Sequence, residues 1–432
     1  MPAHSIQPET LTIYAYQVGF GDCFLLTFHY PKQGAKAAFN RYVLIDFGSS
    51  SLPKNAPKDY MLRVAHDIAT QCAGKLDAII VTHRHSDHLS GFTRRSGGKG
   101  TGDIIRALKP RAVVQPWTED PDAQRDALSP TPGNDPGVPL LRSLANMQNF
   151  AASVVAQSHS LKGKLGANRL EQLAFLGEQN IKNVDAVKNL MTMGKNTYVY
   201  HGSRSGLENL LPGVKIHVLG PPTLKQSSAI RKQRAKDDDQ FWQFQAAAGR
   251  QFATGAAPLF PAALAYRKGQ KPPGYARWLI PRMLSVHADQ LLEIVRILDR
   301  QMNNTSVILL FETAKRKLLF PGDAQIENWL YPLEESPRVS QILPLLADVD
   351  LYKVGHHGSG NATPKSLWGL FRHKGSARKR GRLQSVLSTK AGKHSGVPQE
   401  SLLAALNKET TNHVTEKVKP SKLKKVIGPI EL

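Results

Sequence analysis

The sequence has few cysteines and no long apolar run. Its 432 residues include only two cysteines, Cys23 and Cys72, which excludes a disulfide framework and favours a reducing compartment. No stretch approaches the roughly 18 consecutive apolar residues that a membrane-spanning helix requires. Residues 1–9 lack the charged-then-apolar pattern of a secretion signal. We therefore expect a soluble, cytoplasmic protein with no membrane span.

Acidic residues are also scarce. Asp and Glu number 34 against 57 Lys and Arg, which gives a formal net charge of +23. A field of this sign attracts polyanions, nucleic acid first and an anionic membrane surface second. Aromatic residues make up only 7% of the chain and are not interleaved with basic ones, so base stacking is not indicated. The charge predicts DNA or RNA as a partner.

Length and patterning point to an α/β protein. At roughly 150 residues per domain, 432 residues correspond to one large domain with insertions or to two domains. Short apolar strands and amphipathic helices alternate near both ends of the chain, which favours α/β layering. The strands that precede the polar clusters below are expected at residues 41–47, 76–82, 317–320 and 346–354.

Four potential metal ligands stand within a short stretch directly after the apolar segment 76–82. They are His83, His85, Asp87 and His88. Imidazole and carboxylate suit zinc, or manganese where oxygen ligands are more numerous. His83 and His85 lie two apart on an extended segment, so they point the same way and can hold one ion. Asp87 and His88 follow as the chain turns into a helix and can hold a second ion. The alternative is a solvated loop whose histidines cap a helix.

Further polar residues follow other predicted strands. Asp323 lies in a Gly-Asp turn, where it either bridges metal ions or caps a helix. His356 and His357 lie between glycines. Asp46 ends a strand, where it either orients a ligand through a hydrogen bond or only forms a turn. Because ligand sites in α/β proteins lie at the carboxyl ends of strands, we expect these residues to share one edge of a sheet.

The order of these motifs resembles that of the metallo-β-lactamase superfamily. HRHSDH at 83–88 matches the HxHxDH signature of that superfamily. LLFPGDA at 318–324 is similar to its strand with a metal-bridging aspartate, and VGHHGS at 354–359 is similar to its last-histidine motif. The resemblance implies an αββα sandwich of two mixed β-sheets flanked by helices, with helical or irregular insertions.

One branch is more similar still, the hydrolase domain of competence-type DNA-uptake proteins. Its marks are matched here by VGFGD at 18–22, LID at 44–46 and NNTS at 303–306. The resemblance covers roughly residues 10–115 and 214–408. The domain organisation that it implies comprises a metallo-β-lactamase-like domain at 10–408, insertions at about 120–213 and 225–285, and a basic C-terminal tail at 409–432.

The resemblance also implies two divalent ions, zinc or manganese. The implied ligands are His83, His85, Asp87, His88, Asp323 and His356. Asp87 would also orient or deprotonate the attacking water, and His357 would face the scissile phosphate. We rank His356 as the ligand because it comes first after the strand.

Two other residues are expected to support these ligands. Asp46 and Asn303 would orient them through hydrogen bonds. Many relatives carry a further metal-binding histidine where Met302 and Asn303 stand here. The ion at His83 and His85 is therefore expected to be held more weakly or to be completed by water.

Basic residues gather in two segments that we expect to hold phosphates. These residues are Arg94, Arg95 and Lys99 after the metal motif, and Arg378, Lys379, Arg380 and Arg382 further along the chain. Each segment alone is better explained as a solvated loop that aids solubility. Together with the net charge they favour a polyanionic substrate, bound with the salt dependence of counterion release.

The combined features predict a metal-dependent phosphodiesterase or nuclease that acts on DNA or RNA through a water activated by two metal ions. One alternative is a hydrolase of the same fold that acts on a small substrate, such as a cyclic nucleotide, a lactone or a thioester. The other is a non-catalytic, nucleic-acid-binding effector module that keeps the fold.

Overall fold

The computed structural model describes residues 6–32, 37–120, 183–223, 225–227, 302–394 and 396–432. All of them belong to one compact unit, and the account below concerns these residues. None of the helices described has the length and apolar character needed to cross a lipid bilayer.

The first sheet has seven strands and is mixed. In spatial order they are β13 (Lys424–Glu431), β1 (Thr10–Tyr16), β2 (Cys23–Tyr30), β3 (Phe39–Phe47), β4 (Ala78–Ile80), β5 (Ala112–Pro116) and β6 (Lys195–Val199). The pairs from β13 to β3 are antiparallel, whereas those from β3 to β6 are parallel. The carboxyl ends of β3 and β4 therefore meet at one edge.

The second sheet has six strands and is also mixed. In spatial order they are β12 (Thr411–Val414), β11 (Gln384–Leu387), β10 (Leu351–Lys353), β9 (Lys317–Phe320), β8 (Ile308–Glu312) and β7 (Lys215–Gly220). The four strands from β12 to β9 are parallel, and β8 and β7 continue the sheet in antiparallel fashion.

The two sheets pack face to face. Alternate residues of β1 and β2 join one apolar cluster with residues of β8 and β9, as expected when one side of each strand is buried. The ring centroids of Phe24 and Phe320 lie 6.1 Å apart, and those of Phe28 and Phe311 lie 6.2 Å apart. These contacts form the central core.

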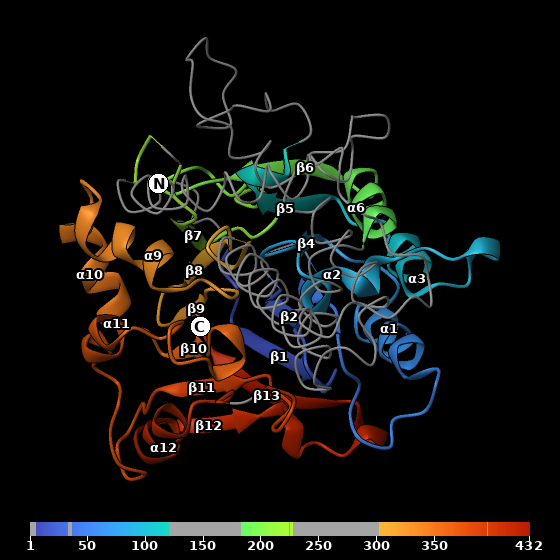
Figure 1. Ribbon diagram of the computed structural model, residues 1–432. Helices are drawn as coiled ribbons and strands as arrows, with labels where there is room; N and C mark the ends of the chain where they lie inside the picture. The colour runs from blue at the N-terminus through green and yellow to red at the C-terminus, as the bar shows by residue number, and fades with distance from the viewer. Residues whose placement is uncertain (1–5, 33–36, 121–182, 224, 228–301, 395) are drawn as a thin grey trace, which may run out of the picture. The chain divides into compact units, whose positions relative to one another are not determined.

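Helices cover the outer face of each sheet (Figure 1). Buried side chains of α1 (Tyr60–Gln71), α3 (Thr101–Ala107) and α6 (Val184–Met191) pack on the seven-stranded sheet. The six-stranded sheet is covered by α9 (Ile326–Leu330), α10 (Val339–Ala347), α11 (Lys365–Leu370) and α12 (Glu400–Glu409). The expected α/β architecture of two mixed sheets flanked by helices is confirmed.

Short helices connect these elements. The four-residue α2 (Ser86–Leu89) follows β4, and a π-helical turn, Tyr331–Glu335, follows α9. The 3-10 turns are Ser90–Phe92, Ser96–Gly98, Trp117–Glu119, His356–Gly358, Thr415–Lys417 and Pro420–Lys422.

Several segments differ from the sequence-based expectation. Residues 409–432 hold β12 and β13 instead of a separate tail, because β13 pairs with β1 and its buried residues Ile427 and Ile430 reach the central core. Within the expected insertion 120–213, residues 183–213 contribute α6 and β6, while 121–182 lie outside the described residues. Most of the other insertion, 225–285, also lies outside them. In the segment 346–354 only Leu351–Lys353 forms a strand, since its first residues end α10.

Candidate metal centre

The polar clusters converge where the parallel strands of both sheets end. Asp46 lies at the end of β3, and the segment 83–88 follows β4. From the other sheet, Asp323 follows β9 and His357 follows β10. The clusters meet at one site, but the expectation of one shared sheet edge is wrong, because the residues come from two sheets that face each other.

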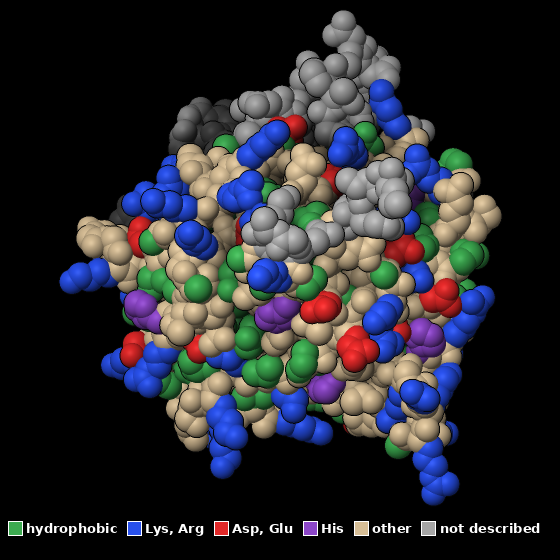
Figure 2. Space-filling view, turned by 180° about the vertical axis from the view of Figure 1, so that it is seen from behind, with side chains coloured by type: hydrophobic (Ala, Val, Ile, Leu, Met, Phe, Trp, Pro, Cys, Tyr) green, Lys and Arg blue, Asp and Glu red, His purple; other side chains and the backbone are tan. Residues whose placement is uncertain are grey.

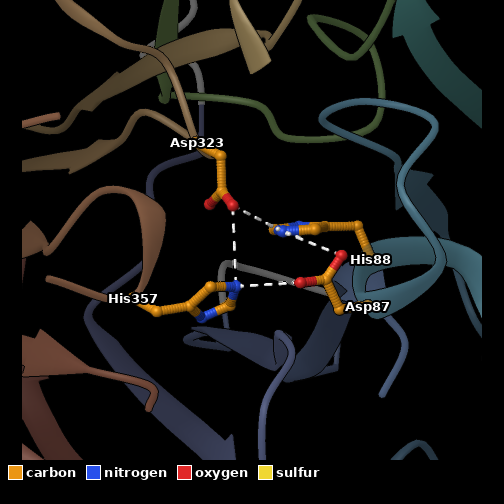
Figure 3. A group of neighbouring side chains, drawn as sticks. All are labelled: Asp87, His88, Asp323 and His357. Atoms are coloured by element: carbon orange, nitrogen blue, oxygen red, sulfur yellow. Dashed lines mark hydrogen bonds and ion pairs between the residues drawn. The ribbon is translucent and has the colours of Figure 1, made fainter. Parts of the chain in front are cut away.

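Four buried side chains form the centre of this site. The ligand atoms of Asp87, His88, Asp323 and His357, which we call the group of four, all lie within 4.8 Å of one another. His88 Nε2 lies 3.0 Å from Asp323 Oδ2, and His357 Nε2 lies 3.2 Å from Asp87 Oδ2 and 3.5 Å from Asp323 Oδ2. Figure 3 shows the four side chains pointing toward one another.

The chemistry of this group fits a divalent cation. Two imidazoles and two carboxylates form a donor set that suits zinc or manganese. Burial opposes ionisation of Asp87, but His88 and His357 outweigh it and lower the pKa of Asp87 to about 2. Asp87 Oδ1 is buried and makes no hydrogen bond within the described part of the chain. Such an oxygen is costly to bury unless it meets a cation or water.

Two partners hold the histidines of the group in place. His88 Nδ1 lies 2.8 Å from Asp46 Oδ2, and His357 Nδ1 lies 3.0 Å from the carbonyl oxygen of Ser388. A neutral imidazole that donates from Nδ1 presents a lone pair at Nε2, which is the atom that faces the group in both cases. Asp46 also accepts hydrogen bonds of 2.8 Å from the amide and the hydroxyl of Thr82. It lies where a residue that orients His88 is expected.

Two glycines allow the backbone to pack tightly behind Asp87. A Cβ atom at Gly48 would lie 2.4 Å from the Asp87 carbonyl carbon, and one at Gly21 would lie 2.7 Å from the Asp87 carbonyl oxygen. That same oxygen accepts a 2.9 Å hydrogen bond from the amide of Asp22. The small residues at these positions therefore fix where α2 begins relative to β3.

His83 and His85 lie beside the group of four. His83 Nε2 is 2.9 Å from His85 Nδ1, and the His83 ring centroid is 4.1 Å from that of His88. Both side chains are buried. Among the described residues, neither belongs to a set of three or more ligand atoms within 4.8 Å of one another.

The positions of His356 and His357 are the reverse of the expected ones. His357 is buried in the group of four, whereas His356 is half-buried outside it. Its Nε2 lies 3.5 Å from the amide nitrogen of Asn303, and its Nδ1 lies 3.4 Å from that of Gln325. Both histidines have positive φ values, 43° and 52°, so the chain turns here and directs the second side chain into the site. The contact of Asn303 at this site is thus with His356.

Two buried charged residues of the site were not assigned from the sequence, Asp22 and Lys353. Lys353 Nζ forms an ion pair with Asp22, lies 3.3 Å from Asp323 Oδ1 and donates a 3.0 Å hydrogen bond to the carbonyl of Gly322. Burial alone would lower its pKa, but Asp22 and Asp323 raise it above the usual value. Asp22 had a signal in the VGFGD motif, and Lys353 had one in its place inside an apolar strand, where a lysine is rare without a partner.

One basic segment lies where the parallel strands end, which is the side of the metal ligands, and the other lies where the parallel strands begin. Arg94, Arg95 and Lys99 precede α3, which returns the chain from the metal side of β4 to the start of β5, so they lie on the metal side. Residues 372–382 instead precede β11, and Arg372 contacts Asp348 ahead of β10 at 3.0 Å. Because β10 and β11 are parallel, this segment lies at the opposite edge from His357. A four-residue strand separates the two edges by about 13 Å.

Comparisons with known proteins give no family: no protein-family model matches the chain, and a search of curated proteins finds no match either.

A second set, Asp22, Asp46 and His88, overlaps the group of four and also has ligand atoms within 4.8 Å of one another. The site is thus a buried cluster of histidines and aspartates able to hold one or two metal ions, which suggests a metal-dependent active site.

Proposed function

We propose that this protein is a metal-dependent hydrolase of the metallo-β-lactamase type, a phosphodiesterase or nuclease that cleaves DNA or RNA. The observation that carries the proposal is the convergence of Asp87 and His88, from the HRHSDH motif, with Asp323 and His357. These residues come from three motifs that resemble that superfamily. Their meeting across two sheets supports a shared chemical role.

Each residue of the site has a role in this proposal. When bound, a divalent ion would lower the pKa of a water molecule and polarise a phosphoryl oxygen. Asp87 Oδ1, which makes no hydrogen bond within the described residues, would orient that water and accept its proton. Asp46 and Ser388 keep the Nε2 atoms of His88 and His357 directed inward. His356 is half-buried beside the group and takes the role of facing the scissile phosphate.

The charge of the chain supports a polyanionic substrate. The net charge is +23, and Lys and Arg side chains are spread over the face seen in Figure 2, with fewer Asp and Glu among them. Of the residues expected to hold phosphates, Arg94, Arg95 and Lys99 lie on the metal side. A polymer bound across the site would meet these three residues and not the segment 372–382.

The activity is tested with nucleic acids and defined metals. Purified protein is incubated with linear, circular and single-stranded DNA and RNA, and separately with cyclic nucleotides, in Mn²⁺, Zn²⁺ or EDTA. We expect cleavage of a polymer that EDTA abolishes. Cleavage of cyclic nucleotides alone would replace the nuclease by a small-substrate hydrolase. Binding of nucleic acid without cleavage under every metal condition would contradict the proposed activity.

The substrate path gives a second prediction. Arg95 and Lys99 are exposed on the metal side, and Arg378 and Arg380 are also exposed, at the opposite edge. Replacing Arg95 and Lys99 together with glutamine should weaken nucleic-acid binding and reduce the slope of log affinity against log salt by about 1.5, since each lost phosphate contact contributes roughly 0.7–0.9. The matched variant Arg378→Gln/Arg380→Gln should bind like the parent. A larger slope change in that second variant would show that the nucleic acid binds at the opposite edge instead.

A further inference from the structure

The overlapping set Asp22, Asp46 and His88 has a charged neighbour inside the protein. The ammonium of Lys353 forms an ion pair with Asp22, and side chains of Lys353 and Asp22 are almost completely buried. A charge this deeply buried is retained only with a close partner of opposite sign. Oδ2 of Asp22 therefore already has a cation, whereas Oδ1 is buried and makes no hydrogen bond among the described residues.

The other members of this set are also engaged. His88 has one Nδ1 atom, and this atom lies 2.8 Å from Asp46 Oδ2. Nδ1 cannot both donate a proton to Asp46 and offer a lone pair to a metal ion. The overlapping set therefore lacks its nitrogen ligand as long as His88 uses Nε2 at the group of four.

The two carboxylate oxygens of Asp323 have different partners. Oδ1 lies 3.3 Å from Lys353 Nζ and accepts a 3.2 Å hydrogen bond from the backbone amide of His356. Oδ2 lies 3.0 Å from His88 Nε2 and 3.5 Å from His357 Nε2. Only Oδ2 thus faces the group of four, whose remaining atoms are directed at the same point (Figure 3).

From this arrangement we infer that Lys353 is a built-in cation that serves Asp22 and Asp323, so that the protein tightly holds one divalent ion, at the group of four, instead of two. The inference rests on the metal-dependent activity proposed above and specifies the metal content of its site. Lys353 is a positioning residue: it holds Asp323 by one oxygen and neutralises the carboxylate that a second ion would otherwise use.

The test measures how many metal ions each protein chain retains. The parent chain is loaded with excess Mn²⁺ or Zn²⁺ and desalted, and its metal content is measured by elemental mass spectrometry. We expect one ion per chain in the parent and less than about 0.1 in His357→Asn. Lys353→Met frees the Asp22 carboxylate and one Asp323 oxygen, which are oxygen ligands that can hold Mn²⁺ without His88, so its Mn²⁺ content should rise toward two. The double variant Lys353→Met/Asp22→Asn should return to one, because the freed carboxylate is removed again.

The outcomes separate the inference from the proposed function. Two tightly held ions in the parent would overturn the inference and leave the hydrolase intact, and the variant His83→Asn/His85→Asn would then show whether the second ion lies at that pair. A folded Lys353→Met variant that still holds one ion would also overturn the role given to Lys353. If Lys353→Met fails to fold, the count in the parent decides. A parent that retains no ion and is not stabilised by added metal would contradict the hydrolase itself.

Discussion

Replacing Asp87 with alanine is expected to lower kcat on nucleic acid by about 10³-fold or more, while the affinity for nucleic acid stays close to that of the parent. The variant loses a member of the group of four and the only carboxylate oxygen of that group without a hydrogen bond among the described residues. Loss of a positioned general base alone typically costs about 10²–10⁴ in rate. Binding should persist because the phosphate contacts are assigned to Arg95 and Lys99.

The measurement is single-turnover cleavage of a labelled oligonucleotide with a parallel binding titration. Asp59→Ala serves as the control, since Asp59 is an exposed carboxylate that pairs with Arg63 on the surface, and it should cut at the parental rate. Cleavage by Asp87→Ala at the rate of the parent, with unchanged metal dependence, would move the chemistry away from this site.

Replacing Lys353 with methionine is expected to lower the free energy of unfolding by about 3–5 kcal/mol when no divalent metal is added. The change leaves Asp22 and Asp323 buried without their lysine, and removing one partner of a buried ion pair typically costs that much. Added Mn²⁺ should restore part of the loss, because a ligand that binds only the folded state stabilises it by mass action.

Urea denaturation of metal-free protein measures this effect. Lys365→Met is the matched control, since Lys365 is exposed at the start of α11, and its effect should stay within about 0.5 kcal/mol. A loss below about 1 kcal/mol in Lys353→Met would show that the buried lysine contributes little net stabilisation to this site.

The parts of the site that are local in sequence could be predicted. The spacing of Asp87 and His88 after an apolar strand places both on one short helical turn, and the structure has them side by side. The directions of His356 and His357, on which the ranking of His356 rested, could not be predicted, because they depend on two successive residues with positive φ. Spacing along a strand predicts side-chain direction only while the backbone stays extended.

Long-range contacts explain the other omissions. Lys353 forms its buried ion pair with Asp22, which lies in the loop between β1 and β2. No local sequence pattern connects these two residues. Residues 424–431 look basic and tail-like in isolation, yet they form an edge strand because β1 offers an unpaired side. The sequence could not show on which side of the sheet the basic segment 372–382 lies, because that depends on the parallel pairing of β10 and β11.

The origin of the group of four in two different sheets also bears on how the protein folds. His88 and Asp323 are 235 residues apart in the chain, and Asp87 and His357 are 270 apart. Contacts of such separation form only after long loops have closed, which is slow. A chain with only one sheet formed offers half of the ligand set, so strong metal binding appears only when both sheets have docked. An ion held there would cross-link the two sheets, and its binding energy would add to the cooperativity of the assembled sandwich.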